Sequence, residues 1–94
     1  MTECREDFVD TDFEAPAGEL ELAVARIEAD VLGIDRIGRA DSFYDFGGTS
    51  LEAIRICARI EGETGVRAQP LWLFSNDILA DFVHQLHQNA DQDE

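Results

Sequence analysis

The apolar residues of this chain recur at three- and four-residue steps in three separate stretches, which is the spacing of one helix face. The first stretch predicts a helix over roughly 18–32, begun near Pro16 and ended at Gly33. The second predicts a helix from Ser50 to about Glu63, and the third predicts a last helix capped by Ser75 or Asn76. The residues of the expected core faces are Leu20, Ala23, Val24, Ile27 and Val31; Ala53, Ile56, Cys57, Ile60 and Thr64; and Ile78, Leu79, Phe82, Val83 and Leu86.

Two connecting segments complete the pattern. Residues 33–49 form a long connection that carries enough apolar residues to be anchored on the domain, namely Ile34, Ile37, Phe43, Tyr44 and Phe46. Pro70 opens a short fourth helix over Leu71–Phe74. Because no segment alternates like a strand, we expect an all-α fold: a four-helix bundle of three long helices and one short one, with a long first loop.

The length and charge of the chain limit its domains and its partners. Its 94 residues hold one domain with a modest core, which leaves little room for a deep active site. We expect a flexible acidic leader over 1–14, the domain over 15–88 and a flexible tail over 89–94. The net charge of −14 argues against nucleic acid and anionic lipid as partners. It either favours proteins with basic docking faces or simply keeps a small domain soluble.

The two cysteines and the lengths of the apolar segments indicate the cellular compartment. Cys4 lies in the acidic leader, whereas Cys57 lies on an apolar helix face and has the character of a small buried hydrophobe. No CxxC motif occurs and no apolar segment is long enough to cross a bilayer, so we expect a cytoplasmic protein that does not enter a membrane.

The stretch from Asp41 to Leu51 is the most informative part of the sequence. Gly47 and Gly48 lack Cβ atoms where the chain must turn sharply, and they allow another molecule to approach the backbone. Ser50 then stands at the start of a helix, where unpaired N–H groups and the helix dipole favour an attached anion. Read by itself, this arrangement more often describes a loop end followed by a capping serine.

The longer string resembles the attachment signature of peptidyl carrier proteins, the thiolation domains of nonribosomal peptide synthesis. Its matching letters are Asp41-x-Phe43-Tyr44-x-x-Gly47-Gly48-x-Ser50-Leu51, and the similarity extends in order and spacing over about residues 15–87. One departure is that Arg67-Ala68-Gln69-Pro70 stands where the family commonly has a Pro-Leu stretch.

The resemblance implies a function and a set of partners. It implies that a phosphopantetheinyl transferase attaches 4′-phosphopantetheine from coenzyme A to Ser50, with Gly47, Gly48 and Thr49 as the attachment loop. A free-standing, monomeric carrier of this kind meets an adenylation enzyme and condensation or tailoring enzymes, and has no catalysis of its own. Fatty-acid and polyketide carriers typically have Asp where this chain has Thr49, which favours the amino-acid branch over an acyl carrier protein. A plain helical interaction module remains the alternative of another class.

The second helix also has a neighbouring apolar face, which we interpret as a docking surface. This face holds Leu51, Ile54 and Ala58, with Arg55 beside it. The alternative is that Leu51 and Ile54 belong to the core. Arg55 and Arg59 either contact partners or pair with Glu52 and Glu63 at helical spacing.

Three further possibilities have less support in the sequence. Hydrolysis by Ser50 would require a base, yet His84 and His87 both lie far along the last helix, and no glycine follows two residues after Ser50. The same histidines lack a clear third ligand, so we expect no metal site. Trp72 is expected to pack in the short helix rather than to serve as a substrate platform.

Overall fold

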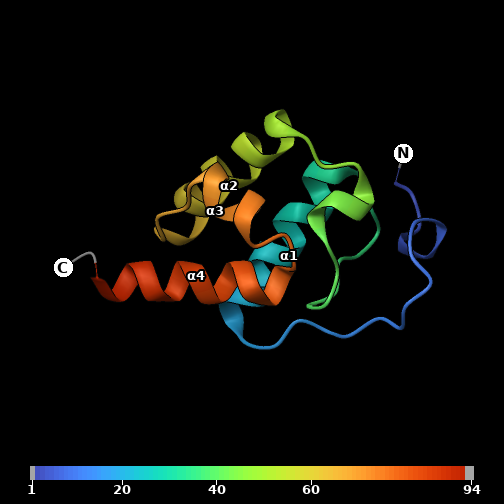
Figure 1. The fold of residues 1–94 in the computed structure, drawn as a ribbon, viewed down its shortest axis with the longest axis horizontal. Coiled ribbons are helices and arrows are strands. Elements are labelled where there is room, and N and C mark those ends of the chain that lie inside the picture. The colour runs from blue at the N-terminus through green and yellow to red at the C-terminus, as the bar shows by residue number, and fades with distance from the viewer. Residues whose placement is uncertain (1, 93–94) are drawn as a thin grey trace.

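The computed structural model describes residues 2–92, and this part of the chain is helical without any strand (Figure 1). Its elements are the 3₁₀ turn η1 (Arg5–Asp7), α1 (Glu19–Leu32), the 3₁₀ turn η2 (Phe43–Phe46), α2 (Ser50–Thr64), α3 (Pro70–Ser75) and α4 (Leu79–Gln92). The predicted fold class, three long helices and one short helix with a long first loop, is confirmed.

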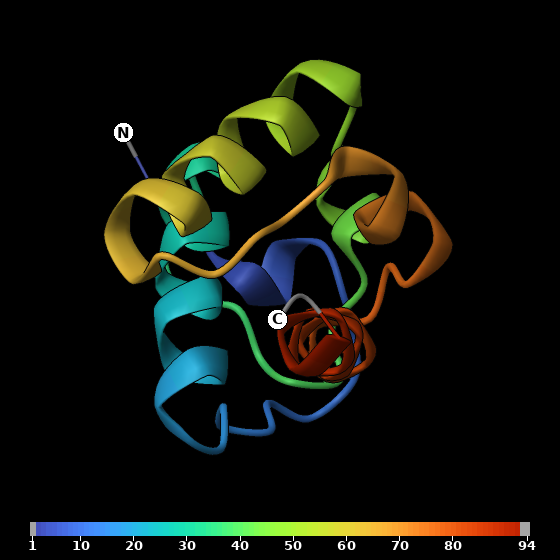
Figure 2. The same cartoon turned by 90° about the vertical axis from the view of Figure 1, so that its left-hand side faces the viewer.

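The four helices surround one core. α1 packs against α2 and α4, and α3 packs against α2 and α4. Figure 2 looks along α4 and shows the other three helices arranged around it. Within residues 2–92, none of the helices has the length and apolar character needed to cross a bilayer.

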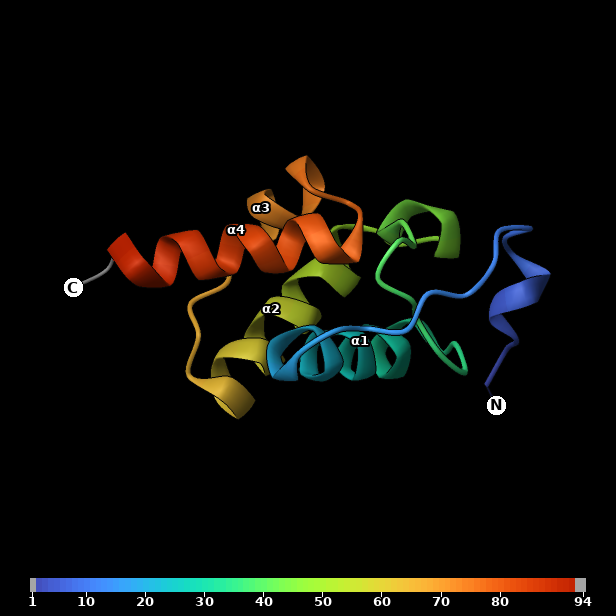
Figure 3. The same cartoon turned by 90° about the horizontal axis from the view of Figure 1, so that it is seen from below.

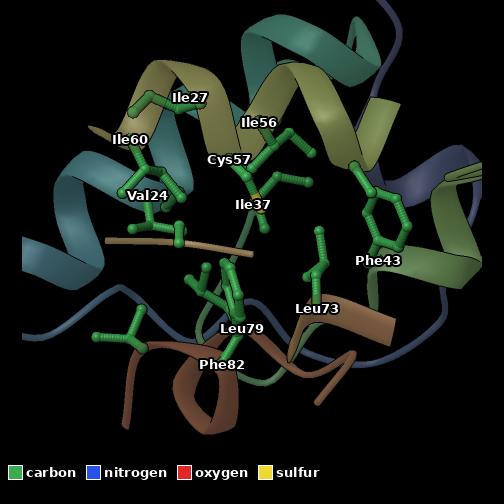
Figure 4. Close-up of a cluster of buried hydrophobic side chains, with 14 of the residues drawn as sticks. Val24, Ile27, Ile37, Phe43, Ile56, Cys57, Ile60, Leu73, Leu79 and Phe82 are labelled. Carbon is green, nitrogen blue, oxygen red and sulfur yellow. The ribbon is translucent and has the colours of Figure 1, made fainter. Parts of the chain in front are cut away.

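The predicted core faces of α2 and α4 are confirmed except for Thr64 and Ile78, which are only partly buried. The predicted face of α1 is confirmed in part, because Leu20, Ala23 and Val31 are only partly buried. Ala53 of α2 is buried. So are Ile56, Cys57 and Ile60 of the same helix and Val24 and Ile27 of α1 (Figure 4). Leu79, Phe82, Val83 and Leu86 of α4 and Leu73 of α3 complete the cluster. Burial raises the pKa of the Cys57 thiol to about 12, which keeps it an inert apolar group.

The long first loop is anchored largely as its apolar residues predict. Ile34, Ile37, Phe43 and Phe46 are buried in the core. Tyr44 differs, since its ring is half exposed, and it is held instead by a hydrogen bond that its hydroxyl donates to the Phe74 carbonyl (2.9 Å). The loop is thereby attached to α3 as well as to the core.

The middle part of the leader over 1–14, which is expected to be flexible, makes specific contacts with the rest of the domain. Arg5 is only 1% exposed and donates to both carboxylate oxygens of Asp41 at 2.5 and 2.8 Å. Phe8 contacts the Phe46 ring, and Arg36 stacks over Phe13. The leader therefore packs on the first loop, because a buried Arg–carboxylate pair and ring contacts offset the acidic charge around them.

The predicted start of α4 requires correction. Ser75 is the last residue of α3 and Asn76 caps that helix, so neither begins α4. The N–H groups of Leu79 and Ala80 instead donate to the carbonyls of Asp41 and Arg39 (3.1 and 3.0 Å). The expected tail from residue 89 is helical as far as Gln92, and residues 93–94 lie outside the described part.

Glu28 is a buried carboxyl group in the middle of α1, and it leads to a prediction about pH. Its Oε2 has no hydrogen-bond partner in the described part of the chain. Burial, and to a lesser degree the charge of Asp41, raises the pKa of Glu28 to about 8. Between the ordinary Glu pKa and this value the folded state holds a proton that the unfolded chain has released. The free energy of unfolding should therefore fall as the pH rises through this window, by at most about 1.4 kcal/mol per pH unit.

Glu28→Gln tests this prediction, because an amide of the same shape has no charge to bury. The variant should match wild type near pH 5 and exceed it near pH 9 by on the order of 3 kcal/mol. Urea unfolding followed by circular dichroism at several pH values measures the difference. Parallel stability profiles for the two proteins would contradict the assignment.

Candidate functional site

The segment that leads into α2 is fixed by hydrogen bonds to the α3–α4 connection. The Phe43 N–H donates to the Asp77 carbonyl (2.8 Å), and the Ser42 hydroxyl donates to the Asp77 carboxylate (2.5 Å). The Phe43 ring is fully buried between Tyr44 and Phe74. These contacts position η2 and the glycines that follow it.

Gly47 and Gly48 are required for different reasons. Gly47 has a φ of 77°, in the left-handed region where a Cβ atom would cause strain. Gly48 lies directly on the Phe43 ring, and a Cβ atom there would come within 2.4 Å of two ring carbons. The first glycine makes the turn possible, and the second lets the backbone pass over a buried aromatic ring.

Thr49 begins α2 through a contact with Glu52. The Thr49 N–H donates to Glu52 Oε1 at 3.0 Å, and the Thr49 hydroxyl donates to the same oxygen. These hydrogen bonds lower the pKa of Glu52 and keep its carboxylate beside Thr49. Thr49 thus serves as the N-cap, and Ser50 is the first residue of the helix.

Ser50 is exposed, and its hydroxyl makes no hydrogen bond with any residue in 2–92. The N–H groups of a first helical turn have no partner within their own helix, and they lie at its positive end. The oxygen of Ser50 is therefore accessible to an enzyme, in a field that favours an attached phosphodiester. On these grounds the residues present fit a phosphate-linked prosthetic group.

The second apolar face of α2 lies in solvent, so the alternative that it belongs to the core is wrong. Leu51 is 52% exposed and Ile54 is 55% exposed, and Arg55 and Ala58 are exposed as well. On α3, Leu71 is a further exposed apolar residue, with 67% of its surface accessible. The sequence pattern indicates Leu71 only as part of a short apolar segment. Leu71 follows Pro70 on a helix of six residues, too short for periodicity to show which side chains face outward.

The two arginines of α2 differ in their contacts. Arg59 pairs with Glu63 at 2.9 Å and with Asp30 of α1 at 3.4 Å, as helical spacing predicts for the first of these pairs. Arg55 makes no ion pair within the described part of the chain, and its charge only contributes to lowering the pKa of Glu52. Arg55 is therefore the basic group beside Ser50 that is available to another molecule.

The structure gives no support to the hydrolase or histidine–metal alternatives. His84 and His87 are exposed on α4 and line a groove of about 1000 Å³ against the start of α1, a groove that does not include Ser50. The donor atoms that lie close enough for a shared ion, in residues 2–92, belong to Cys4, Glu6 and Asp35, which are all exposed. Trp72 is partly buried against the core, in agreement with a packing role.

Comparison with known proteins identifies the family. Residues 23–86 match the family model described as "Phosphopantetheine attachment site". Malpibaldin synthetase of Mortierella alpina is 34% identical over 83 residues, covering 88% of this chain and 2% of the synthetase. A linear gramicidin synthase of Brevibacillus parabrevis is 37% identical over 75 residues, covering 80% of this chain. The chain spans only 2% and 1% of the lengths of these two relatives.

Solved structures agree with this assignment. A docking-domain complex of the Pax nonribosomal peptide synthetase superposes with a TM-score of 0.76 and 31% identity, covering 85% of this chain and 77% of that chain. The peptidyl carrier protein complex with the phosphopantetheine transferase Sfp and coenzyme A gives a TM-score of 0.74 at 28% identity, covering 81% and 99%. The helical fold, the glycine turn and the exposed serine are thus found together in a chain whose sequence matches the same group of proteins. The chain belongs to the phosphopantetheine attachment-site family, and its relatives within that family are the peptidyl carrier domains of nonribosomal peptide synthesis.

Proposed function

We propose that Ser50 is the residue that carries 4′-phosphopantetheine, and that the chain tethers an aminoacyl group for the enzymes of a nonribosomal peptide or hybrid pathway. The observation that supports this most strongly is the exposed hydroxyl of Ser50 at the start of α2, which bonds to none of the described residues and lies inside the stretch that matches the attachment family. Gly47, Gly48 and Thr49 form the turn that presents it. The domain is a carrier and a substrate of other enzymes, not an enzyme.

The attachment step is a phosphoryl-group transfer to the serine oxygen. Ser50 Oγ attacks the coenzyme A phosphorus that bears the pantetheine arm, and loses its proton to a base on the transferase. A new P–O bond to Ser50 forms as the pyrophosphate bond of coenzyme A breaks, and adenosine 3′,5′-bisphosphate leaves. When bound, the arm supplies a terminal thiol that holds the substrate as a thioester.

The chain's own contribution to the holo form is electrostatic and geometric. The first turn of α2 favours the phosphodiester by about 0.3–1 kcal/mol at an exposed position. The half-exposed Leu51 and Ile54 keep the arm beside an apolar surface on which an enzyme can dock. A flexible tether on such a domain keeps its substrate at an effective concentration on the order of mM for the docked enzyme.

The amino-acid branch is favoured over a fatty acyl or polyketide cargo. Thr49 replaces the aspartate that acyl carriers typically place before the serine, and a similar protein of Curvularia clavata is named as a nonribosomal peptide synthetase. The acyl-carrier alternative has one supporting observation, a similar structure described as a type-II acyl carrier protein from Streptomyces verticillus (TM-score 0.70, 30% identity). Loading assays with aminoacyl and acyl thioesters distinguish the two.

The partners we propose are proteins that act on a monomeric carrier domain. They are a phosphopantetheinyl transferase, an adenylation enzyme, and condensation or tailoring enzymes. Similar solved structures include a carrier bound to a transferase and an adenylation–carrier pair. The net charge of −14 favours such partners over nucleic acid or a membrane. We place the protein in the cytoplasm, in line with two unpaired cysteines, one exposed and one buried.

Incubation of the apo protein with coenzyme A and a promiscuous transferase tests the proposed attachment. We expect intact-mass spectrometry to show the addition of one phosphopantetheine group, and peptide mapping to place it on Ser50. An unchanged mass under these conditions, with a control carrier fully modified, would support the non-catalytic interaction module instead.

Ile54→Asp tests the docking surface formed by Leu51, Ile54, Arg55 and Ala58. A charge on this exposed face should leave the helical circular dichroism unchanged and weaken reactions with partner enzymes by on the order of tenfold. Leu22→Asp is the matched control, because Leu22 of α1 is also 55% exposed, on another helix. Normal rates for Ile54→Asp with every cognate enzyme, or equal losses for both variants, would remove the docking assignment.

A further inference from the structure

The N-terminal segment of residues 3–14 lies along the first loop and outside the stretch that matches the attachment family (Figure 3). Glu3 forms a parallel bridge with Ile34, in which the Glu3 N–H donates to the Gly33 carbonyl and the Asp35 N–H donates to the Glu3 carbonyl, both at 2.8 Å. At the other end of the segment the Arg39 N–H donates to the Glu14 carbonyl at 2.8 Å. We call residues 3–14 the strap, because both of its ends are bonded to the loop.

Arg5 is the buried centre of the strap. Its side chain is 1% exposed, and its guanidinium donates to both carboxylate oxygens of Asp41, to Glu6 (3.0 Å) and to the Asp12 carbonyl (3.3 Å). Its own N–H donates to the Asp35 carboxylate at 2.8 Å. A two-pronged pair of this kind fixes direction as well as distance, since the planar guanidinium matches a carboxylate in one orientation.

Asp41 transmits this anchorage to the segment that carries Ser50. One of its carboxylate oxygens also accepts from the Gly38 N–H (2.8 Å), and its carbonyl accepts from the Leu79 N–H at the start of α4. The residues directly after it are Ser42 and Phe43, whose bonds to Asp77 hold η2 in place. Arg5, Asp41 and the Ser50 turn therefore form one connected chain of contacts.

The close approach of strap and loop shows that this packing is specific. A Cβ atom on Gly38 would lie 2.8 Å from the Glu14 carbonyl oxygen and 3.2 Å from the Phe13 ring. Further contacts join the strap to the loop, since Arg36 donates to the Glu6 carboxylate at 3.0 Å and stacks over Phe13, and Phe8 contacts the Phe46 ring. A segment held only by nonspecific contacts would leave its single arginine in solvent, because burying an unpaired charge costs free energy.

Resting on the proposed attachment at Ser50, we propose that Arg5 is a positioning residue for that reaction: through its buried pair with Asp41, the strap holds the 38–49 segment in the conformation that the transferase recognises. Without the pair, the segment samples other conformations, and the transferase must select the competent one. The apparent dissociation constant is then the intrinsic one divided by the fraction of competent molecules, so binding weakens, while the chemical step within the complex is unchanged.

Steady-state modification kinetics of Arg5→Met test this proposal, at a temperature where circular dichroism shows the variant folded. We expect the KM for the carrier to rise roughly five- to tenfold with kcat within about twofold, because only the competent fraction binds. Arg26→Met is the matched control, since it removes an arginine paired with Glu63 on the exposed surface between α1 and α2. The control should keep the wild-type KM.

A more conservative variant covers the case in which Arg5→Met does not fold. Arg5→Lys keeps a buried positive charge but reaches Asp41 through a single point of contact, so it should raise KM by an intermediate, about two- to threefold, amount. Hydrogen exchange provides an independent measurement. The amides of Gly38, Phe43 and Leu79 should exchange faster in both variants, while those of Ile56 and Ile60 in α2 remain protected.

The outcomes separate this proposal from the proposed function. A wild-type KM in folded Arg5→Met and Arg5→Lys, or faster exchange spread evenly over the domain, would overturn the positioning role. Absence of modification in the wild-type protein would instead overturn attachment at Ser50. In that case amide hydrogen exchange in residues 38–49, compared between wild type and the Arg5 variants, still decides whether Arg5 orders the loop.

Discussion

Ser50→Ala should abolish the mass increase that coenzyme A and a transferase produce in the wild-type protein. Only the hydroxyl oxygen of this residue can form the phosphodiester in the proposed reaction, so the expected loss is complete rather than partial. The fold should tolerate the change, because the hydroxyl makes no hydrogen bond within residues 2–92 and alanine suits a first helical position. We expect the free energy of unfolding to change by less than about 0.5 kcal/mol.

Ser75→Ala is the control for this experiment. Ser75 is also exposed and ends α3, but it follows no glycine turn and does not begin a helix. It should be modified at the wild-type rate. A phosphopantetheine adduct on Ser50→Ala would show that the attachment site lies elsewhere, and loss of helicity in that variant would make Ser50 a structural residue.

Gly48→Val should both destabilise the domain and impair modification. The new Cβ atom would come within 2.4 Å of the Phe43 ring, which is fully buried in the core. Overpacking of this kind costs on the order of 2–3 kcal/mol. The turn must shift to relieve it, and a displaced Ser50 should slow modification by roughly 10–100-fold, since reaction rates fall steeply with misplacement.

Gly62→Val separates this effect from the general cost of a β-branched side chain. Gly62 lies inside α2, and a Cβ atom there would meet nothing within 4 Å. Because valine is a better helix former than glycine, we expect unchanged or slightly higher stability, by a few tenths of a kcal/mol. Thermal unfolding and transferase kinetics on both variants provide the comparison. Equal stability of the Gly48 and Gly62 variants would contradict the role assigned to the Phe43 contact.

The elements of this fold were predictable because local pattern and tertiary packing agree. The three- and four-residue spacing of the apolar residues from Ala53 to Ile60 identifies the buried face of α2, and glycines follow α1 and α2 where the helices end. The glycine turn and Ser50 could be recognised for the same reason: their function depends on neighbours within a few residues. A site built from one short segment leaves its pattern in the sequence.

The contacts of Arg5 could not be predicted from that pattern. Its partner Asp41 is 36 residues away, and both lie in segments without helical periodicity. The start of α4 was missed for a similar reason, since its first N–H groups bond to the carbonyls of Arg39 and Asp41 rather than to a capping side chain. Main-chain carbonyls carry no residue-type signal, so nothing in the sequence points to them.

The sequence by itself determined the four helices, the main buried residues of α2 and α4 and the serine that begins α2, because each depends on spacing along one helix or turn. Only the tertiary structure decided that Leu51 and Ile54 face solvent, that Gly48 lies on a buried ring and that the acidic leader packs on the loop. Exposure and close contact depend on which distant elements cover a residue, and a one-dimensional pattern does not contain that information.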